Sequence, residues 1–303
     1  MVGRAILRSG IAQNREILTV DRLEVDLKNA ADVLNFMKSK KPESVILAAA
    51  KVGGIYANMS QKTKFLTENL AIQNSVILGA LESGVRKLVF LGSSCIYPKN
   101  APQPMPEECL LTGPLEPTNE AYALAKISGV KLCQYIREEH SLDYFSLMPT
   151  NLYGPGDNFD LKTSHVPAAL MRKFHEGKVE GANSVKIWGT GSPMREFMHV
   201  DDLADAVWFA FENPPAENLI NVGYGSEISI GDFAHKISEV VGFNGDLEFD
   251  TLMPDGTPRK LLDSKKLFDL GWRPKITLDD GLKSTYKWFL ENKELGTVRG
   301  YDR

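Results

Sequence analysis

Residues 87–98 of the chain read KLVFLGSSCIYP, and this stretch decides the fold class. Its first part, 87–91, is an apolar run that suits a strand buried on both faces of a parallel sheet. Small and hydroxyl-bearing residues follow at once, where such a strand would end. Comparable runs rich in Val, Ile, Leu and Phe occur at residues 17–20, 44–50 and 144–150. We expect each run to be a strand of one sheet.

Helical patterns separate these runs. They cover residues 29–40, 60–83 and 118–140, and Gly84 is the expected stop of the second. Strands that alternate with amphipathic helices predict right-handed crossovers and a Rossmann-like, doubly wound α/β fold. Ligands of such sheets bind at the carboxyl ends of the strands, so the informative residues are expected directly after each strand.

The second half of the chain is less regular. Loops rich in Gly, Pro and Asn precede shorter helices, and Asp201 is expected to cap one of them. Residues 295–303 are expected to form a loose polar tail. We interpret this half as a smaller α/β substrate domain interleaved with the first. The predicted cofactor domain comprises residues 1–155 and about 193–223, and the predicted substrate domain comprises about 156–192 and 224–303.

Composition limits the function further. The chain has 303 residues, a net charge of −4 and a pI near 5.8, which offer no basic field for nucleic acid or an anionic membrane. Cys95, Cys109 and Cys133 fit neither a disulfide framework nor metal-ligand spacing, so we expect reduced thiols and no metal. No apolar run suits a signal peptide or a membrane span, and we expect a soluble, cytoplasmic protein.

Tyr122 and Lys126 share one face of the third predicted helix. An ammonium group beside a phenol stabilises the phenolate and lowers its pKa from about 10, which suits proton exchange with a carbonyl oxygen. Taken alone, the two residues could equally be an exposed i,i+4 pair, and residues 92–98 a plain turn. A strand, then serines, then a Tyr-x-x-x-Lys helix is the order of the short-chain dehydrogenases, which predicts a nicotinamide enzyme.

Six segments resemble GDP-L-fucose synthases, which are extended short-chain dehydrogenases. They are residues 48–55 (AAAKVGGI), 92–98 (GSSCIYP), 116–120 (EPTNE), 148–155 (MPTNLYGP), 193–197 (PMREF) and 254–260 (PDGTPRK). Related epimerases and dehydratases usually lack the cysteine of the serine loop. The resemblance implies a homodimeric 3,5-epimerase and 4-reductase that converts GDP-4-keto-6-deoxy-D-mannose to GDP-L-fucose with NADPH. A different sugar-nucleotide epimerase or dehydratase of the same fold is the alternative.

The resemblance also assigns catalytic roles. A C4 ketone acidifies the protons at C3 and C5, so inversion needs a base on one face and an acid on the other. By resemblance Cys95 is the base and His165 the acid. Taken alone, Cys95 would be a packing residue and His165 a residue at a helix start. The other residues implied in catalysis are Ser93, which hydrogen-bonds the substrate oxygen, Tyr122, which protonates it, and Lys126, which orients the ribose.

Binding residues follow from the same resemblance. The NADP(H) contacts that it implies are Gly3, Arg22, Ala49, Leu91, Gly92, Ser93, Ser94, Lys126, Pro149, Thr150, Asn151, Leu152 and His165. The implied contacts of the GDP-sugar are Ser94, Cys95, Asn151, Lys173, Trp188, Arg195, Asp255 and Lys260. From the residues alone, Lys173 and Lys260 could equally be solvated surface lysines.

The amino terminus departs from the family pattern. Family members open with a strand and a G-x-x-G-x-x-G turn, and Met1-Val2-Gly3 matches only the last part of that turn. A missing central strand would leave its neighbours with unpaired ladders, and the pyrophosphate would lose most of its amide cradle. We expect a truncated start. An inactive form that only binds nucleotide or a partner, or an amino-terminal piece supplied otherwise, are the alternatives.

Overall fold

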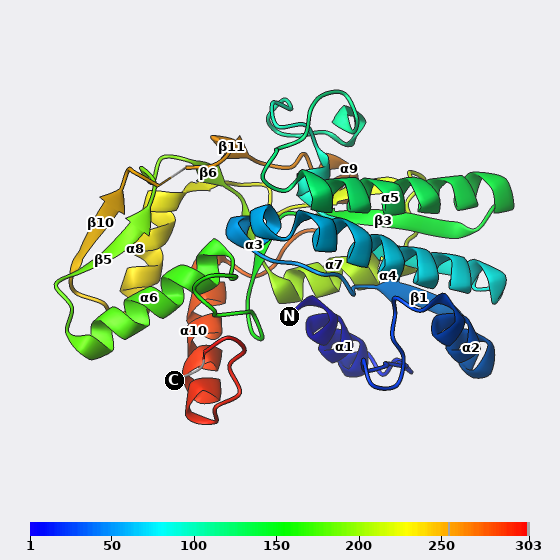
Figure 1. Ribbon diagram of the computed structural model, residues 1–303, viewed down its shortest axis with the longest axis horizontal. Helices are drawn as coiled ribbons and strands as arrows, with labels where there is room; N and C mark the ends of the chain where they lie inside the picture. The colour runs from blue at the N-terminus through cyan, green and yellow to red at the C-terminus, as the bar shows by residue number, and fades with distance from the viewer. Residues whose placement is uncertain (254, 302–303) are drawn as a thin grey trace.

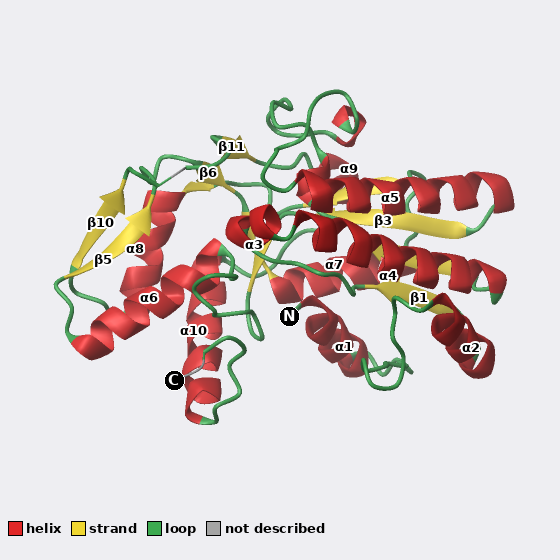
Figure 2. Cartoon of the chain, in the orientation of Figure 1, coloured by secondary structure: helices red, strands yellow, loops and turns green. Residues whose placement is uncertain are grey.

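A computed structural model describes residues 1–253 and 255–301, and its main element is a parallel four-stranded sheet in the order β1-β2-β3-β8 (Figures 1 and 2). Val45 and Tyr144 both lie opposite Leu88 in the ladders. The strands are β1 (Ser44–Leu47), β2 (Lys87–Leu91), β3 (Asp143–Pro149) and β8 (Leu219–Val222). The predicted parallel sheet is therefore confirmed.

Helices cover both faces of the sheet, which explains why its strands are apolar throughout. Leu88 and Phe90 belong to one buried cluster, and Val89 and Leu91 to the cluster on the opposite face. The helices of the first cluster are α2 (Ala30–Lys40), α4 (Lys62–Glu82) and α5 (Glu120–His140). Those of the second are α1 (Val2–Ala12), α7 (Val200–Glu212) and α9 (Lys265–Asp269).

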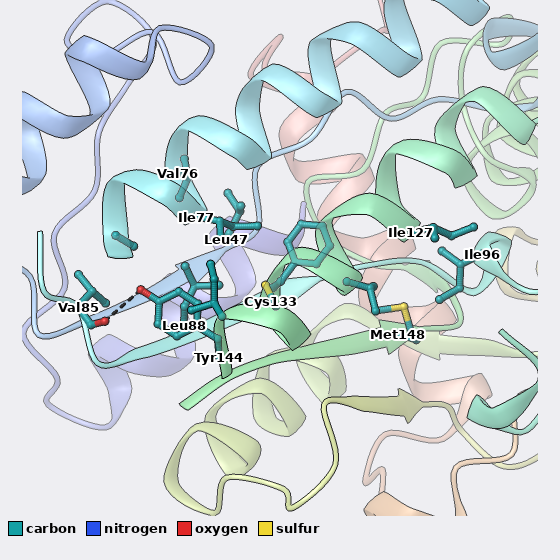
Figure 3. Packing of buried hydrophobic residues seen from close by; sticks show 14 of the residues in the cluster. Leu47, Val76, Ile77, Val85, Leu88, Ile96, Ile127, Cys133, Tyr144 and Met148 are labelled. Carbon is teal, nitrogen blue, oxygen red and sulfur yellow. Dashed lines mark hydrogen bonds between the residues drawn. The ribbon is translucent and has the colours of Figure 1, made fainter. Parts of the chain in front are cut away.

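The first cluster is tightly packed between the sheet and α4 and α5 (Figure 3). Ile77, Leu88 and Tyr144 are fully buried in it. The hydroxyl of Tyr144 donates a hydrogen bond to the carbonyl of Val85 at 3.0 Å, so the one polar atom of this ring has a partner inside the apolar layer. This packing fixes the strand ends that carry the candidate site.

The prediction of a strand at residues 17–20 is wrong for the described structure. The segment lies along the sheet without a ladder, although Ile17 and Val20 pack against the two core clusters. A strand exists only through hydrogen bonds to a neighbour, and β1 is an edge of the described sheet whose ladder runs to β2 alone. The apolar side chains of residues 17–20 therefore pack in the core, but their backbone forms no ladder with a neighbouring strand.

Helix boundaries follow their expected signals with two exceptions. Asn29 caps α2 by accepting hydrogen bonds from the N–H groups of Ala31 and Asp32. The single helix predicted at residues 60–83 is two helices, α3 (Ile55–Ser60) and α4, which meet at Gln61. The cap of α7 is His199, whose Nδ1 accepts from the N–H of Asp201, so the capping role predicted for Asp201 is wrong.

A second group of elements packs around its own apolar cluster, away from the four-stranded sheet (Figure 1). Its helices are α6 (Val166–Glu180), α8 (Ile230–Val241) and α10 (Leu278–Glu294). Its small sheets pair β5 (Ser184–Trp188) with β10 (Asp246–Asp250), and β6 (Met194–Arg195) with β9 (Ile228–Ser229) and β11 (Arg259–Lys260). The strands β4 (Asn151–Tyr153) and β7 (Phe197–His199) pair in between.

The prediction of a loose tail at residues 295–303 is also wrong as far as the structure describes it. Val298 is 6% exposed and belongs to the second group's core, and Tyr301 packs on Phe289 at 5.4 Å between ring centroids. Val298 and Tyr301 are apolar contacts within an otherwise polar segment. No helix among the described residues is long and apolar enough to cross a bilayer.

Candidate active site

The loop after β2 brings hydroxyl and thiol groups to the carboxyl end of the sheet. Ser93 caps the short helix η1 (Ser94–Ile96), and its Oγ accepts from the N–H of Cys95 at 3.4 Å. Gly92 makes this turn close to the neighbouring strand, because a Cβ there would lie 2.0 Å from the Cε of Met148. The predicted serine loop is thus held against β3 by packing.

Tyr122 and Lys126 lie on α5, beside this loop. Lys126 is 3% exposed, and its ammonium donates to the carbonyl of Leu91 at 2.8 Å. The same Nζ lies 5.9 Å from the centre of the Tyr122 ring. A hydrogen bond with Ser93 also acts on Tyr122. The structure therefore brings together Ser93, Tyr122 and Lys126, as the order of motifs predicts.

The titration of this group differs from the sequence prediction. Burial raises the pKa of Tyr122 above its ordinary value, and the hydrogen bond with Ser93 only partly opposes this effect. Burial also lowers the pKa of Lys126 to about 8, because the charged form is desolvated. The expected lowering of the Tyr122 pKa by Lys126 is not observed. A protonated phenol suits a group that delivers a proton to a carbonyl oxygen.

The ammonium of Lys260 acts electrostatically on both Cys95 and His165. Burial raises the pKa of the Cys95 thiol, and among the groups that oppose this effect Lys260 is the strongest. The His165 ring keeps solvent access but is otherwise surrounded by protein, which lowers its pKa. The carboxylate of Asp157 raises that pKa, and Lys260 lowers it further. The two residues of the expected acid–base pair thus share one cation between them.

Arg195 and Lys260 are directly opposite each other in the parallel pair of β6 and β11. Two cations in this position repel unless an anion lies between or beside them. Asp255 acts electrostatically on Arg195, and its carboxylate also accepts from the N–H and Oγ1 of Thr190 at 2.7 and 2.9 Å. The predicted substrate residues of this segment are therefore neighbours, and their binding of an anionic group stays a prediction.

Lys173 and Trp188 form a separate pair on α6 and β5. The Lys173 ammonium donates to the carbonyl of Lys186 at 2.9 Å and lies 5.8 Å from the centre of the Trp188 ring. Trp188 is 55% exposed, which is a large apolar surface to leave in water. The pair could stack on and hydrogen-bond a flat polar ring, so the expectation of substrate contacts stays a prediction with suitable chemistry.

Many of the residues predicted to bind the cofactor lie at the carboxyl ends of β1, β2 and β3, but Gly3 lies on α1 and Arg22 lies in the segment before α2. Gly3, in the first turn of α1, is exposed beside Ala48, and a Cβ on it would lie 3.9 Å from the Ala48 Cβ. Asn151 donates through its side chain to the carbonyl of Glu196 at 2.9 Å. Arg22 lies in an exposed turn, and its contact with a phosphate stays a prediction. The remaining residues of this set are Ala49, Leu91, Gly92, Ser94, Pro149, Thr150 and Leu152.

These donors fit a nicotinamide dinucleotide. An ammonium group has three N–H donors, and Lys126 uses one of them on Leu91, which leaves donors for two ribose hydroxyls. The hydroxyls of Ser93 and Tyr122 lie next to it, where a substrate oxygen would be hydrogen-bonded. The first turn of α1 adds backbone N–H groups at the same edge of the sheet, which favour a phosphate.

Sequence reasoning did not single out two buried acids of this region. Glu196 is fully buried, and its carboxylate accepts from the N–H groups of Gly225 at 2.8 Å and Leu262 at 3.2 Å. Asp157 is 7% exposed, and one of its carboxylate oxygens has no hydrogen-bond partner in the described structure. The available signal for Glu196 was weak, since it lies between Arg195 and Phe197 in the Met-Arg-Glu-Phe segment at residues 194–197.

A surface hollow of about 760 Å³ lies at the opposite edge of the sheet. It is lined by the first residues of three strands, Ser44, Lys87 and Asp143, together with lysines and acids of the adjoining loops. Ser93 and Cys95 follow the opposite, carboxyl end of β2, so this hollow does not belong to the site. No group of His, Cys, Asp and Glu in the described part of the chain could hold a metal ion.

Comparison with known proteins identifies relatives along nearly the whole chain. The model of the NAD dependent epimerase/dehydratase family matches residues 1–223. GDP-L-fucose synthase 1 of Arabidopsis thaliana is 56% identical over 293 residues, which cover 96% of this chain and 91% of the relative. The GDP-L-fucose synthase of Escherichia coli (strain K12) is 49% identical over 306 residues, covering 97% and 95%.

A solved structure shares the fold. It is a GDP-L-fucose synthetase from Naegleria fowleri bound to NADP, with a TM-score of 0.87, 27% identity, and coverage of 97% of this chain and 92% of the other. The sheet, the Ser–Tyr–Lys arrangement and these relatives all indicate the same protein family. This chain belongs to the NAD dependent epimerase/dehydratase family.

Proposed function

We propose that the chain is a GDP-L-fucose synthase, which epimerises GDP-4-keto-6-deoxy-D-mannose at C3 and C5 and then reduces its C4 ketone with NADPH. The observation that carries this proposal is the position of Cys95, two residues after Ser93 in the serine loop and within the electrostatic influence of Lys260. A thiol in this place adds an acid–base group to a site otherwise built for carbonyl reduction. Relatives that are 49–56% identical and bear the name of this activity support it.

Epimerisation uses Cys95 and His165. The C4 ketone lets the thiolate of Cys95 remove a proton from C3 or C5, with the resulting charge on the C4 oxygen. The imidazolium of His165 returns a proton to the opposite face, which inverts the carbon. Lys260 acts electrostatically on both residues, and its charge stabilises the thiolate and the anionic intermediate.

Reduction uses the residues of α5. When bound, NADPH supplies a hydride to C4. Tyr122 carries the proton that the C4 oxygen takes up, since burial keeps the phenol protonated at neutral pH. Ser93 hydrogen-bonds the same oxygen and orients it, and Lys126 binds ribose hydroxyls beside them. One ketone thus directs both reactions.

The second group of elements supplies the GDP contacts. Arg195 and Lys260 bind the diphosphate, whose two negative charges relieve the repulsion between these cations. Trp188 stacks on the base, and Lys173 donates to its oxygen. This assignment gives the substrate domain of about residues 156–192 and 224–303 its function and residues 1–155 and 193–223 the cofactor, except that Arg195, on β6, contributes to the substrate site.

Two further features complete the proposal. The outward faces of α4 and α5 carry exposed apolar side chains, Leu78, Leu124 and Tyr135, which are 48%, 43% and 51% exposed. We assign these helices to a homodimer interface, since paired helices would bury such side chains in a bundle. Three free, buried cysteines suit a reducing compartment and thus the cytoplasm.

The test uses Cys95→Ser with Cys109→Ser as its control, because both cysteines are free and buried but only Cys95 lies in the serine loop. Exchange of C3 and C5 hydrogens with deuterated solvent should fall by about 10²–10⁴-fold in Cys95→Ser and persist in Cys109→Ser. NADPH should be consumed with the GDP-sugar and not with UDP-sugars. Undiminished exchange in Cys95→Ser would refute the assignment.

A further inference from the structure

The carboxyl-terminal segment after α10 folds back onto the loop that leads to His165. This segment, Gly296 to Tyr301, leaves the end of α10 and doubles back beside that helix (Figure 1). Val298 anchors it in the core of the second group. The carbonyl of Arg299 then accepts a hydrogen bond from the N–H of Phe159 at 2.9 Å. A segment distant in sequence thus contacts the loop at residues 157–165.

Arg172 joins the segment, the loop and the helix that follows His165. It lies on α6, and its Nη1 donates to the carbonyl of Phe159 at 2.9 Å and to the carbonyl of Gly300 at 2.8 Å. The guanidinium also lies 4.6 Å from the centre of the Tyr301 ring. One side chain therefore ties two chain segments to α6, whose capping residue is His165.

The fit at Gly300 is too close for any side chain. Its φ of +74° is a conformation that favours glycine, and a Cβ there would lie 2.4 Å from the Oδ1 of Asn158 and 2.6 Å from the N of Asp160. Gly296 has a similar φ of +67°, but a Cβ on it would meet nothing within 4 Å. Gly296 and Gly300 thus have the same kind of backbone conformation, but only Gly300 is in close contact with the loop at residues 157–165.

A series of hydrogen bonds connects residues 158–160 to the chain just before His165. The Asn158 side chain donates to the Oγ1 of Thr163 at 2.9 Å, and the N–H and Oγ1 of Thr163 donate to Asp160 at 2.9 and 2.7 Å. The carbonyl of Thr163 in turn accepts from the N–H of Gly54 at 3.0 Å, which lies on the loop after β1. His165 follows two residues later, at the start of α6.

We propose that the segment from Gly296 to Tyr301 is a strap that positions His165 for proton transfer, acting through Arg172 and the close contact of Gly300 with residues 158–160. The strap does not touch the substrate, so its residues are positioning residues. This inference rests on the proposed role of His165 as the acid of epimerisation. It predicts that loosening the strap slows epimerisation more than it affects cofactor binding.

The experiment compares Gly300→Ala with Gly296→Ala in the full chain. With NADP⁺ present in place of NADPH, solvent deuterium entering C3 and C5 reports proton transfer alone. We expect about a tenfold or larger loss of this exchange in Gly300→Ala, since small displacements of a catalytic group have such effects, and less than about twofold in Gly296→Ala. Arg172→Met should behave like Gly300→Ala. The dissociation constant of NADPH should be unchanged in all three.

A second measurement, amide hydrogen exchange, tests whether the strap orders the loop independently of the role of His165 in the reaction. Amide hydrogen exchange across residues 158–165 should speed up in Gly300→Ala and not in Gly296→Ala. Equal amide exchange in the two variants, or equal rates of C3 and C5 exchange, would overturn the strap. Faster amide exchange with an unchanged reaction, together with full activity of His165→Asn, would show that the strap exists and that the role of His165 is wrong.

Discussion

The ammonium of Lys126 donates a hydrogen bond to the carbonyl of Leu91, the last residue of β2, at 2.8 Å. This contact couples the helix that carries Tyr122 to the strand that carries the serine loop. Burial lowers the pKa of Lys126 to about 8, because the fold keeps its ammonium group away from water. Such an arrangement costs stability and is typical of a functional group.

Replacing Lys126 by Met should therefore separate stability from activity. Removal of a desolvated charge by an apolar chain of similar length should leave the melting temperature unchanged or raise it. Binding of NADPH should weaken and reduction should fall, because the donors to the ribose are lost. Lys131→Met, on the same helix, removes an ammonium that donates to the side chain of Gln134, and it is the control. Calorimetry and NADPH titration measure the two effects, and a destabilised variant with normal reduction would contradict this role.

Tyr122→Phe should stop reduction and spare epimerisation. The phenol hydrogen is the proton delivered to the C4 oxygen, whereas proton transfer at C3 and C5 uses Cys95 and His165. We expect the NADPH oxidation rate to fall by about 10²–10⁴-fold while solvent deuterium still enters the substrate. The two rates can be followed in one reaction by absorbance and mass spectrometry. Hydride transfer at the full rate would exclude Tyr122 as the proton donor.

Asp157→Asn should change the pH dependence of epimerisation. The reactive form carries a Cys95 thiolate and a His165 imidazolium, but burial raises the pKa of the first and lowers the pKa of the second. The neutral pair therefore predominates, and the ion pair is a minor tautomer. The Asp157 carboxylate raises the His165 pKa, opposed by Lys260, so its loss should make the ion pair rarer.

The measurement is the pH profile of C3 and C5 deuterium exchange. In Asp157→Asn the plateau rate should fall, and the acid limb should move to lower pH because His165 then becomes protonated only in more acidic solution. Asp143→Asn, an exposed acid at the opposite edge of the sheet, should leave both unchanged. A lower plateau with an unmoved acid limb would mean that Asp157 acts on the loop and not on the His165 proton.

Glu196→Ala should destabilise the fold strongly. The substitution leaves the buried N–H groups of Gly225 and Leu262 without acceptors, and each such group costs about 1–3 kcal/mol. We expect a loss of roughly 3 kcal/mol in the free energy of unfolding, measured in urea. Glu212→Ala removes only an exposed pair with Arg15 and should cost less than about 1 kcal/mol. Similar losses in both variants would show that the Glu196 contacts are not structural.

Three strands of the sheet and the order of the catalytic motifs can be read from the sequence, whereas β8 was not predicted. Apolar runs such as 87–91 predict strands buried on both faces, and the polar residues after them must lie at the carboxyl edge because parallel strands share one direction. The helix at residues 29–40 and the Tyr122–Lys126 spacing are local patterns, which is why they could be placed without a structure.

Features that depend on contacts between distant parts of the chain could not be predicted from the sequence. Residues 17–20 have strand composition but lack a ladder in the described chain, since hydrogen bonds need a partner that composition cannot name. The pKa of Tyr122 rises because burial outweighs its neighbours, and burial is a property of the packed molecule. Glu196, Asp157 and the strap after α10 acquire their roles through contacts across the fold, which spacing along the chain does not encode.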